Sequence, residues 1–415
     1  MINRSNGVTA LQFKLGIVAA VLNLLLISRA GAKADGPARI WPVPDWTTAT
    51  PESQGMDATK LDKLRQYLEK QLTREALVIR HGKIVGEWYW RDAARDTKLQ
   101  VYSVTKSISS TAVGLLVGDG KLKLEQSVSD LIPTWKSDDR KNITIRHLVS
   151  MTSGIKLEQY DYFFSKDQLK LSLEQPLSSP PGTKWEYNNL ACNCLSEIVS
   201  KASGEELSDF LQKRLYDPIG IKNAAMDKKG GRTLAYMGLN ITARDLARIG
   251  YLFLNKGMWN GKRILTEDWV KQATRTSQSL NPGYGYLWWV HSANRQAEEE
   301  PSDSYEAIGL YGNYLCVFPS QDMIVIRLIG TGSGQPSDVD RFKMKSLALD
   351  SIVDAKKAAF LTIWTMVSER MSASPGLLLA QFSRIRLNDL EKPDQTMSDI
   401  VDRPRKRRRP RSSQV

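Results

Sequence analysis

The chain has 415 residues, 41% hydrophobic and 25% charged, which is enough to bury a large core in one or two domains and excludes a disordered chain or a membrane bundle. The formal net charge of +13 is concentrated at the ends, because residues 1–34 hold four basic side chains and no acidic one, and residues 403–411 hold seven basic ones. Residues 35–402 keep only about +2, so the body of the chain gives no electrostatic reason to expect nucleic-acid binding.

The N-terminus has the pattern of a secretory signal peptide over residues 1–34. The basic residues Arg4 and Lys14 accompany an apolar run from Leu15 to Ile27, and Ala32-Lys33-Ala34 supplies the small residues that a signal peptidase requires. We expect cleavage near Asp35 and a secreted or periplasmic protein. The run is shorter than the roughly 20 residues of a membrane span, and an uncleaved signal that anchors the protein to the inner membrane is the alternative.

After an irregular lead-in over 35–55, the patterns of strand and helix follow in blocks. A helix is predicted from the N-cap candidate Asp57 to Gln71, and strands at 76–79 and 85–90 flank the turn signal His81-Gly82-Lys83 as in a hairpin. A buried helix is expected over 103–116, and a mainly helical stretch runs to about residue 275, with helices at 145–151, 190–203 and 243–254. Strands are predicted at 284–291, 304–310, 314–318 and 323–328, with a turn at 319–322 and a helix from about 339.

This order predicts an α+β fold. An antiparallel sheet made from both ends of the chain is flanked by helices and carries a mainly helical insert. The sheet region covers 57–100 and 284–371, and the helical region covers 101–283. A cleft between the sheet and the insert is the natural place for a site.

The C-terminal residues 372–415 lose apolar periodicity and are rich in Pro, Asp and Arg, so we predict a disordered basic tail. The tail is a candidate for weak contact with anionic surfaces. The apolar stretch 358–367 before it is too short to span a bilayer and is expected to form a docked helix.

The cysteines and histidines form no metal-ligand pattern, so no metal or cofactor is predicted. Cys192 and Cys194 are too close in sequence for easy bridging, and with Cys316 they are expected to be buried small hydrophobic residues. The three histidines are expected in a turn, in a helix and at the surface, respectively: His81, His147 and His291.

The first chemical signal is Ser103-Val104-Thr105-Lys106, at the start of the predicted buried helix. Residues i and i+3 share a helix face, so the hydroxyl of Ser103 and the amine of Lys106 come within reach of each other. A serine hydroxyl is a weak nucleophile unless a neighbour takes its proton, and a lysine does so where its surroundings favour the neutral amine. Free N–H groups at the helix start also favour an oxyanion. A second S-x-x-K, Ser153 to Lys156, contains Gly154 and is predicted to be a turn.

The second signal is Tyr187-Asn188-Asn189, between the loop signal Pro180-Pro181-Gly182 and the helix that starts at Leu190. A tyrosine on such a loop can face a cleft and relay a proton, and the amide of Asn189 can bond a substrate carbonyl or Lys106. A helix cap with a packed tyrosine is the alternative. The same spacing recurs in Tyr311-Gly312-Asn313.

The third signal is Ala307-Ile308-Gly309-Leu310, in the predicted strand region. A glycine in a strand lets a ligand approach the backbone closely. The N–H of Leu310 is a candidate oxyanion donor beside the N–H of Ser103. A bulge or bend in the strand is the alternative.

These three signals in this order resemble the class C β-lactamase superfamily, which includes penicillin-binding proteins, serine esterases and 6-aminohexanoate-dimer hydrolases. The resemblance covers about residues 45–350, and further stretches agree with it at 148–154, 242–250 and 283–289. It implies a β-lactamase/transpeptidase-like fold and a seryl acyl-enzyme, with Ser103 as nucleophile and Lys106 and Tyr187 as its proton-transfer partners. We place the serine hydrolase domain at residues 35–371. We assign oxyanion stabilisation and substrate binding to Ser103, Leu310, Asn189 and Gly309.

One departure concerns the third motif. β-Lactamases and penicillin-binding proteins carry Lys-Thr-Gly there, whereas this chain has Ala307-Ile308-Gly309, so the lysine that grips a β-lactam or peptide carboxylate is absent. The Ala-x-Gly-x-x-Gly form, which ends at Gly312, is more similar to the 6-aminohexanoate-dimer hydrolase and esterase branch. The resemblance therefore implies a small amide or ester substrate, with β-lactamase or D-alanyl peptidase activity as the alternative.

Two further hypotheses stay open. In the first, the protein keeps the fold but is a catalytically idle peptidoglycan-binding member. In the second, it is an envelope interaction protein that acts through its basic tail. No G-x-S-x-G occurs, which argues against an α/β-hydrolase, and the scattered histidines give a Ser-His-Asp triad no positional support. Four aromatic residues are candidates either for the cleft or for packing: Trp185, Tyr160, Trp289 and Tyr311.

Overall fold

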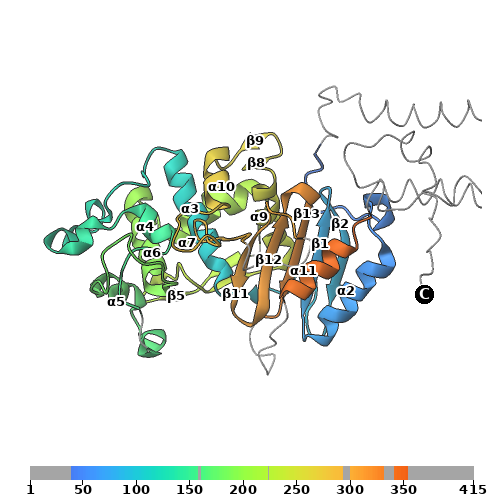
Figure 1. Cartoon of the computed structure of the whole chain (residues 1–415), viewed down its shortest axis with the longest axis horizontal. Coiled ribbons are helices and arrows are strands. Elements are labelled where there is room, and N and C mark those ends of the chain that lie inside the picture. The colour runs from blue at the N-terminus through green and yellow to red at the C-terminus, as the bar shows by residue number, and fades with distance from the viewer. Residues whose placement is uncertain (1–38, 158–159, 223, 293–299, 331–340, 354–415) are drawn as a thin grey trace, which may run out of the picture. The chain divides into compact units, whose positions relative to one another are not determined.

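A computed structural model describes residues 39–157, 160–222, 224–292, 300–330 and 341–353. Its largest sheet is antiparallel and has, within these residues, the strand order β10-β11-β12-β13-β1-β2 (Figure 1). Two strands come from early in the chain and four from late: β1 (Glu75–Arg80), β2 (Lys83–Tyr89), β10 (Trp289–Val290), β11 (Tyr305–Gly309), β12 (Asn313–Phe318) and β13 (Met323–Leu328). The predicted α+β fold, with a sheet from both ends of the chain, is confirmed.

Strand β1 lies inside the sheet and joins the early and late segments. It pairs with β13 from Glu75 opposite Leu328 onward and with β2 on its other side. All six of its residues are buried. The predicted hairpin is confirmed, because His81 and Gly82 have φ of 50° and 75°, the left-handed values that a tight two-residue hairpin turn requires.

Helices cover both faces of the sheet (Figure 1). On one face, α2 (Ala58–Lys70) packs against α11 (Arg341–Asp350), and on the other face lie α9 (Ala243–Leu254) and α3 (Val104–Gly118). As predicted, α2 starts at the N-cap Asp57, whose carboxylate accepts a hydrogen bond from the N–H of Lys60 at 3.1 Å. Buried ion pairs link α11 to the sheet, since Lys345 Nζ lies 2.7 Å from Glu300 and 3.5 Å from Glu306.

The region between the two sheet segments is mainly helical, as predicted. Besides α3 and α9 it contains α4 (Ile145–Val149), α5 (Gln168–Glu174), α6 (Asn189–Ser203), α7 (Leu207–Leu211), the π-helix η6 (Gln212–Tyr216), α8 (Asp217–Ile219) and α10 (Glu267–Ala273). Short 3₁₀ helices occur at η1 (Glu52–Gln54), η2 (Val128–Asp130), η3 (Pro133–Ser137), η4 (Asp139–Asn142), η5 (Tyr160–Phe164), η7 (Leu310–Gly312) and η8 (Pro319–Gln321).

Several short strands in and beside this region were not predicted. They form one three-stranded sheet and two hairpins: β3 (Leu99–Gln100) with β7 (Leu239–Ile241) and β4 (Ala224–Met226), β5 (Lys228–Lys229) with β6 (Arg232–Thr233), and β8 (Met258–Trp259) with β9 (Lys262–Arg263). Strands of two or three residues are too short to show the alternation of apolar and polar side chains from which a strand is predicted.

The strand predicted over 284–291 is mostly wrong. Only Trp289–Val290 is a strand, and Leu287 interrupts the extended conformation with a φ of 60°. The main chain here bonds neighbouring helices instead of a sheet partner. The Leu287 carbonyl accepts from Ser107 Oγ at 2.6 Å, and its N–H donates to the Val149 carbonyl at 2.9 Å. The helix predicted over 145–151 also ends early, at Val149, because Met151 has a φ of 61°.

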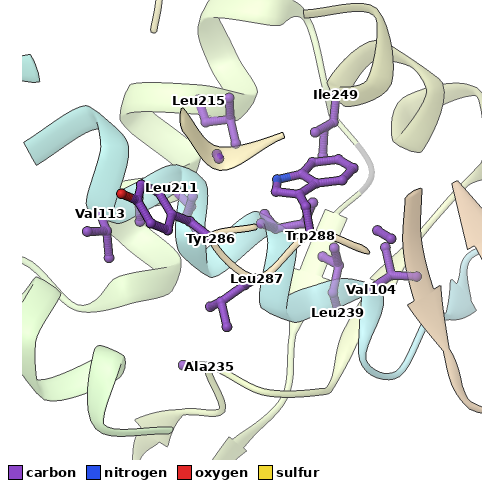
Figure 2. Close-up of a cluster of buried hydrophobic side chains, with 14 of the residues drawn as sticks. Val104, Val113, Leu211, Leu215, Ala235, Leu239, Ile249, Tyr286, Leu287 and Trp288 are labelled. Carbon is purple, nitrogen blue, oxygen red and sulfur yellow. The ribbon is translucent and has the colours of Figure 1, made fainter. Parts of the chain in front are cut away.

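A hydrophobic core surrounds α3, whose residues from Val104 to Leu116 are all buried. Figure 2 shows Val104 and Val113 of α3 among apolar side chains from four other segments, which include Leu211, Leu239, Ile249 and Trp288. Each fully buried side chain of this size stabilises the fold by about 1.5–3 kcal/mol relative to an exposed one. The N-terminus of α3 is therefore held in a rigid setting.

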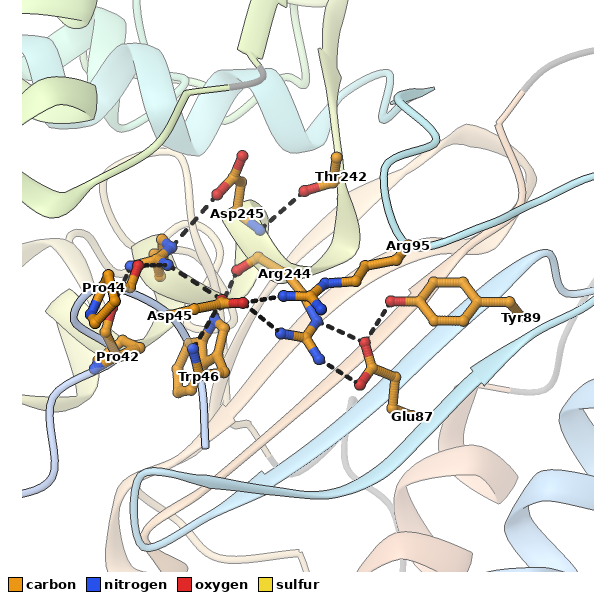
Figure 3. Close-up of polar contacts among 11 residues, drawn as sticks. Pro42, Pro44, Asp45, Trp46, Glu87, Tyr89, Arg95, Thr242, Arg244 and Asp245 are labelled. Carbon is orange, nitrogen blue, oxygen red and sulfur yellow. Dashed lines mark hydrogen bonds and ion pairs between the residues drawn. The ribbon is translucent and has the colours of Figure 1, made fainter. Parts of the chain in front are cut away.

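A polar network fastens the irregular lead-in to the fold (Figure 3). Asp45 is paired with Arg244 at 3.0 Å, with Arg248 at 3.4 Å and with Arg95. Arg244 also pairs with Glu87 of β2 at 2.6 Å. Burial alone would raise the pKa of Glu87, but the hydrogen bonds from Arg244 and a neighbouring tyrosine lower it. The lead-in is thus tied to both α9 and the sheet.

The contacts of the chain divide it into a unit that ends at Ser351 and a second unit over 352–415, of which only residues 352 and 353 are described. The predicted signal peptide over 1–34, the helix expected at 358–367, the domain end at 371 and the basic tail over 372–415 lie outside the described residues. In the part of the chain that the structure describes, no helix combines the length and apolar character needed to cross a membrane.

Candidate active site

The S-x-x-K motif lies at the N-terminus of α3, as predicted. Ser103 is the half-buried N-cap residue, and Lys106 Nζ lies 2.9 Å from Ser103 Oγ. Tyr102, just before the serine, has a φ of 49°, a left-handed conformation that bulky residues rarely adopt. The Thr105 hydroxyl fixes this turn by donating to the Tyr102 carbonyl at 2.6 Å. The candidate nucleophile is therefore presented on a constrained turn and contacts its candidate base.

The amine of Lys106 is buried, with only 1% of the residue exposed. It donates a second hydrogen bond to the carbonyl of Tyr236, at 3.0 Å. It also lies 4.8 Å from the ring centre of Tyr187 and 5.3 Å from that of Tyr236, within the range of cation–π contact. The amine thus contacts two aromatic rings and donates hydrogen bonds to the serine hydroxyl and to a main-chain carbonyl.

Tyr187 is packed among aromatic side chains as well as against Lys106. The ring of Trp289 is stacked on it at 5.9 Å with an interplanar angle of 15°. Tyr284 contacts the ring edge-on at 6.4 Å, and Trp185 packs against Trp289 at 6.1 Å. The structure therefore brings Ser103, Lys106 and Tyr187 together, and places Trp185 and Trp289 in the aromatic cluster around the tyrosine.

The loop that carries Tyr187 also forms the alternative feature, a helix cap. Asn188 is the N-cap of α6, where its side chain accepts from the Ala191 N–H at 2.9 Å and donates to the Ile155 carbonyl at 2.7 Å. Asn189 is the first residue of α6 and is half-buried. The cap and the contact of Tyr187 with Lys106 are compatible, because different residues serve them.

The end of β11 meets the segment before the nucleophile. A Cβ added to Gly309 would lie 2.1 Å from the carbonyl oxygen of Val101, so only glycine fits. We predicted that this glycine admits a ligand. The group that approaches it is instead the chain's own main chain, two residues before Ser103. Leu310, the candidate oxyanion donor, follows at the start of η7 and is 56% exposed.

The buried side chain of Arg327 holds the turn after Leu310 in place through hydrogen bonds. Tyr311 has a φ of 64°, and its carbonyl accepts from Arg327 Nη1 at 3.1 Å. Arg327 also donates to the carbonyls of Gly312 and, at 2.8 Å, of Gln71. Burial lowers the pKa of this arginine to about 10. The ring of Tyr311 packs edge-on against that of Tyr102 at 5.2 Å, so the second Y-x-N sequence borders the site as well.

The remaining predicted residues lie as follows. The second S-x-x-K is not helical, since Gly154 has a φ of 72° and the Oγ of the buried Ser153 accepts from the Ile155 N–H at 3.3 Å. His81 lies in the β1–β2 turn, His147 forms a capping box in α4, and the half-buried His291 follows β10. The three cysteines are free and buried, as predicted. The side chain of Tyr160 lies outside the described part of the chain.

Sequence reasoning missed Tyr102 and Tyr236. The left-handed backbone conformation at Tyr102 could not be predicted from the sequence, because tyrosine rarely adopts it. Tyr236 contributes its carbonyl to Lys106, and every residue has a carbonyl, so no sequence signal marks it. Among the described residues, no group of three or more His, Cys, Asp or Glu side chains could hold a metal ion.

An antiparallel sheet from both chain ends, a helical insert and a Ser–Lys pair at the start of a buried helix define the class of serine hydrolases with the β-lactamase fold. The family model described as Beta-lactamase matches residues 63–349, and the chain belongs to this family. Members of the family are serine hydrolases, and this protein is one of them.

Named relatives narrow the comparison. The chain is 25% identical over 307 residues to the 6-aminohexanoate-dimer hydrolase of Paenarthrobacter ureafaciens, a match that covers 65% of this chain and 76% of that one. It is 28% identical over 213 residues to Esterase EstB of Burkholderia gladioli, with 42% and 53% covered. A solved structure described as a putative 6-aminohexanoate-dimer hydrolase from Bacillus anthracis has the same fold, with a TM-score of 0.63, 21% identity and coverage of 76% and 89%.

Proposed function

We propose that this protein hydrolyses small amide or ester substrates through an acyl-enzyme on Ser103. The single observation that carries the proposal is the 2.9 Å contact between the buried Lys106 amine and the Ser103 hydroxyl. A neutral amine at that distance can accept the hydroxyl proton as the oxygen attacks a carbonyl. No metal or cofactor takes part in this scheme.

The proposed reaction has two balanced halves. In the first, Ser103 Oγ bonds the substrate carbonyl carbon while Lys106, or alternatively Tyr187, takes the hydroxyl proton. The N–H groups of Ser103 and Leu310 stabilise the oxyanion. As this intermediate collapses, the bond from the carbonyl carbon to the amine nitrogen or alcohol oxygen breaks, and Tyr187 delivers the proton to that leaving group. In the second half, water attacks the seryl ester and the same groups move its proton. Loss of one oxyanion donor typically costs about 10²–10³ in rate.

Two observations support an amide or ester over a β-lactam. Ala307 stands where β-lactamases and penicillin-binding proteins have the lysine that grips a carboxylate, as the resemblance implies. Two relatives are named a 6-aminohexanoate-dimer hydrolase and an esterase. We therefore place β-lactamase and D-alanyl peptidase activity second.

A fluorophosphonate probe tests the proposal. The wild-type protein should be labelled at Ser103, and Ser103→Ala should abolish both labelling and the hydrolysis of p-nitrophenyl acetate. Ser153→Ala is the matched control, because Ser153 begins the second S-x-x-K but is buried in a turn, and it should keep its label. A folded wild-type protein that is neither labelled nor active would instead support a catalytically idle binding member. Nitrocefin, D-amino acid peptides and short amide oligomers then rank the substrates.

We further propose that the N-terminal signal directs the protein to the periplasm or outside the cell, either cleaved near Asp35 or retained as an inner-membrane anchor. The charge and apolar patterns of residues 1–34 support this. N-terminal sequencing of the protein purified from its own cells tests it. Nucleic acid is not an expected partner. If the basic tail instead carries the function, deletion of 403–415 should abolish that function while ester hydrolysis persists.

A further inference from the structure

A cavity of about 420 Å³ is lined in part by Tyr236, the residue whose carbonyl accepts from Lys106, and it has no part in the mechanism above. Its walls come from η5, α5, the β5–β6 hairpin and the segment before β7. A volume of this size is typical of a small-molecule site.

Two walls of the cavity are bonded to the segment that carries the nucleophile. The Tyr236 carbonyl accepts from Lys106 Nζ at 3.0 Å, so it shares that amine with the Ser103 hydroxyl. On another side, Asp227 Oδ2 accepts from Gln100 Nε2 at 2.8 Å, and Gln100 lies in β3, directly before the S-x-x-K turn. Tyr236 therefore links the wall of the cavity to the amine that contacts Ser103.

Half of the lining residues are apolar or aromatic. Phe163, Leu234, Tyr236 and Met237 contribute to it, and Phe163 is 39% exposed. The polar tip of Tyr236 is already bonded, since its hydroxyl donates to Gln168 Oε1 at 2.9 Å. The walls thus favour a chain of methylene groups. Burial of each methylene is worth about 0.8 kcal/mol, or up to about fourfold in kcat/KM.

Positive charge is the second feature of the lining. Lys228 and Lys229 of β5 are both exposed, and neither forms an ion pair with a described residue. The acidic residue of the lining, Asp227, has both oxygens engaged, because Oδ1 accepts from Asn240 Nδ2 at 3.0 Å and Oδ2 accepts from Gln100. The ammonium groups of Lys228 and Lys229 therefore favour an incoming anion, despite the nearby carboxylate of Asp227.

We propose that this cavity receives the acyl group of the substrate, and that this group is an apolar chain that ends in a carboxylate. The proposal rests on the acyl-enzyme function above and names its substrate class. The chain lies along the apolar walls, and its carboxylate meets Lys228 and Lys229. The Ser–Lys–Tyr arrangement by itself does not select for an acyl group with an apolar chain and a terminal carboxylate.

Three p-nitrophenyl esters test the proposal with the full-length protein: the acetate, the octanoate and the mono-ester of suberic acid, which has the octanoate chain length with a terminal carboxylate. The wild-type protein should hydrolyse the suberate with the highest kcat/KM. Met237→Trp, which fills the cavity, should lower the octanoate-to-acetate ratio of kcat/KM at least tenfold. Lys228→Glu with Lys229→Glu should lower the suberate-to-octanoate ratio by about threefold to tenfold, and high salt should have the same effect in the wild type.

A matched charge control is Lys262→Glu with Arg263→Glu, in the exposed β8–β9 hairpin, whose residues do not line this cavity. It should leave both ratios as in the wild type. The proposal is overturned if Met237→Trp keeps the wild-type chain-length preference, or if the two hairpin variants change the suberate-to-octanoate ratio equally. A wild-type protein that hydrolyses no ester and is not labelled at Ser103 would overturn the proposed function itself, whereas acetate hydrolysis without these preferences would overturn only the cavity proposal.

Discussion

Replacement of Glu75 by glutamine should make the stability of the protein less sensitive to pH. Glu75 begins β1 and is fully buried. Its Oε2 accepts from the Ala243 N–H at 3.0 Å, while Oε1 has no hydrogen-bond partner among the described residues. Burial raises the pKa of this carboxyl from 4.5 to about 8, against the lowering effects of the Ala243 N–H and the charge of Arg74.

The magnitude follows from that pKa. Below about pH 4.5 the carboxyl is protonated in both the folded and the unfolded chain. Between pH 4.5 and about 8 only the unfolded chain ionises, so the free energy of unfolding falls as the pH rises. Each pH unit in this window costs about 1.4 kcal/mol, which gives a total of about 5 kcal/mol by pH 8. Above pH 8 both states are ionised, and the loss stays constant.

Urea unfolding at pH 5, 6, 7 and 8 measures this effect. Glutamine does not ionise, so the free energy of unfolding of Glu75→Gln minus that of the wild type should rise by several kcal/mol across the series. At pH 5 the variant should be no more stable than the wild type, because its amide N–H groups lack acceptors, at a cost of about 1–3 kcal/mol. The exposed Glu52→Gln is the control and should show no such trend. A difference for Glu75→Gln that is constant with pH would refute the reasoning.

Three further predictions concern the site. Gly309→Ala should reduce kcat/KM for p-nitrophenyl esters at least 100-fold and lower the melting temperature, because its methyl group would lie 2.1 Å from the Val101 carbonyl; wild-type kinetics would show that this contact is not needed. Arg327→Lys should lower kcat about tenfold with little change in KM, because it removes hydrogen bonds to the turn after Leu310. Arg248→Lys, at a comparably buried arginine of the lead-in network, should leave kcat unchanged. Tyr187→Phe should keep the ring packing but lower kcat by about 10²–10⁴, and full activity would remove the phenol from the mechanism.

The agreement between sequence and structure is uneven along the chain. The helix over 58–70, the hairpin at His81 and the late strands β11 to β13 carry long patterns, and these were predicted to within a few residues. The stretch 284–288 lies in the strand predicted over 284–291, but in the structure it is not a strand. Its main chain instead forms hydrogen bonds with residues of α3 and α4. These partners lie more than a hundred residues away in the sequence.

The sequence by itself determined what depends on neighbours within one helical turn. The spacing of Ser103 and Lys106 puts hydroxyl and amine on the same side of α3 wherever that helix lies, and their contact follows from local geometry. Only the tertiary structure decided what surrounds this pair, namely the ring of Tyr187, the carbonyl of Tyr236 and the end of β11 against Val101. These contacts join distant segments, and the packing of the whole core sets their positions, so no local pattern encodes them.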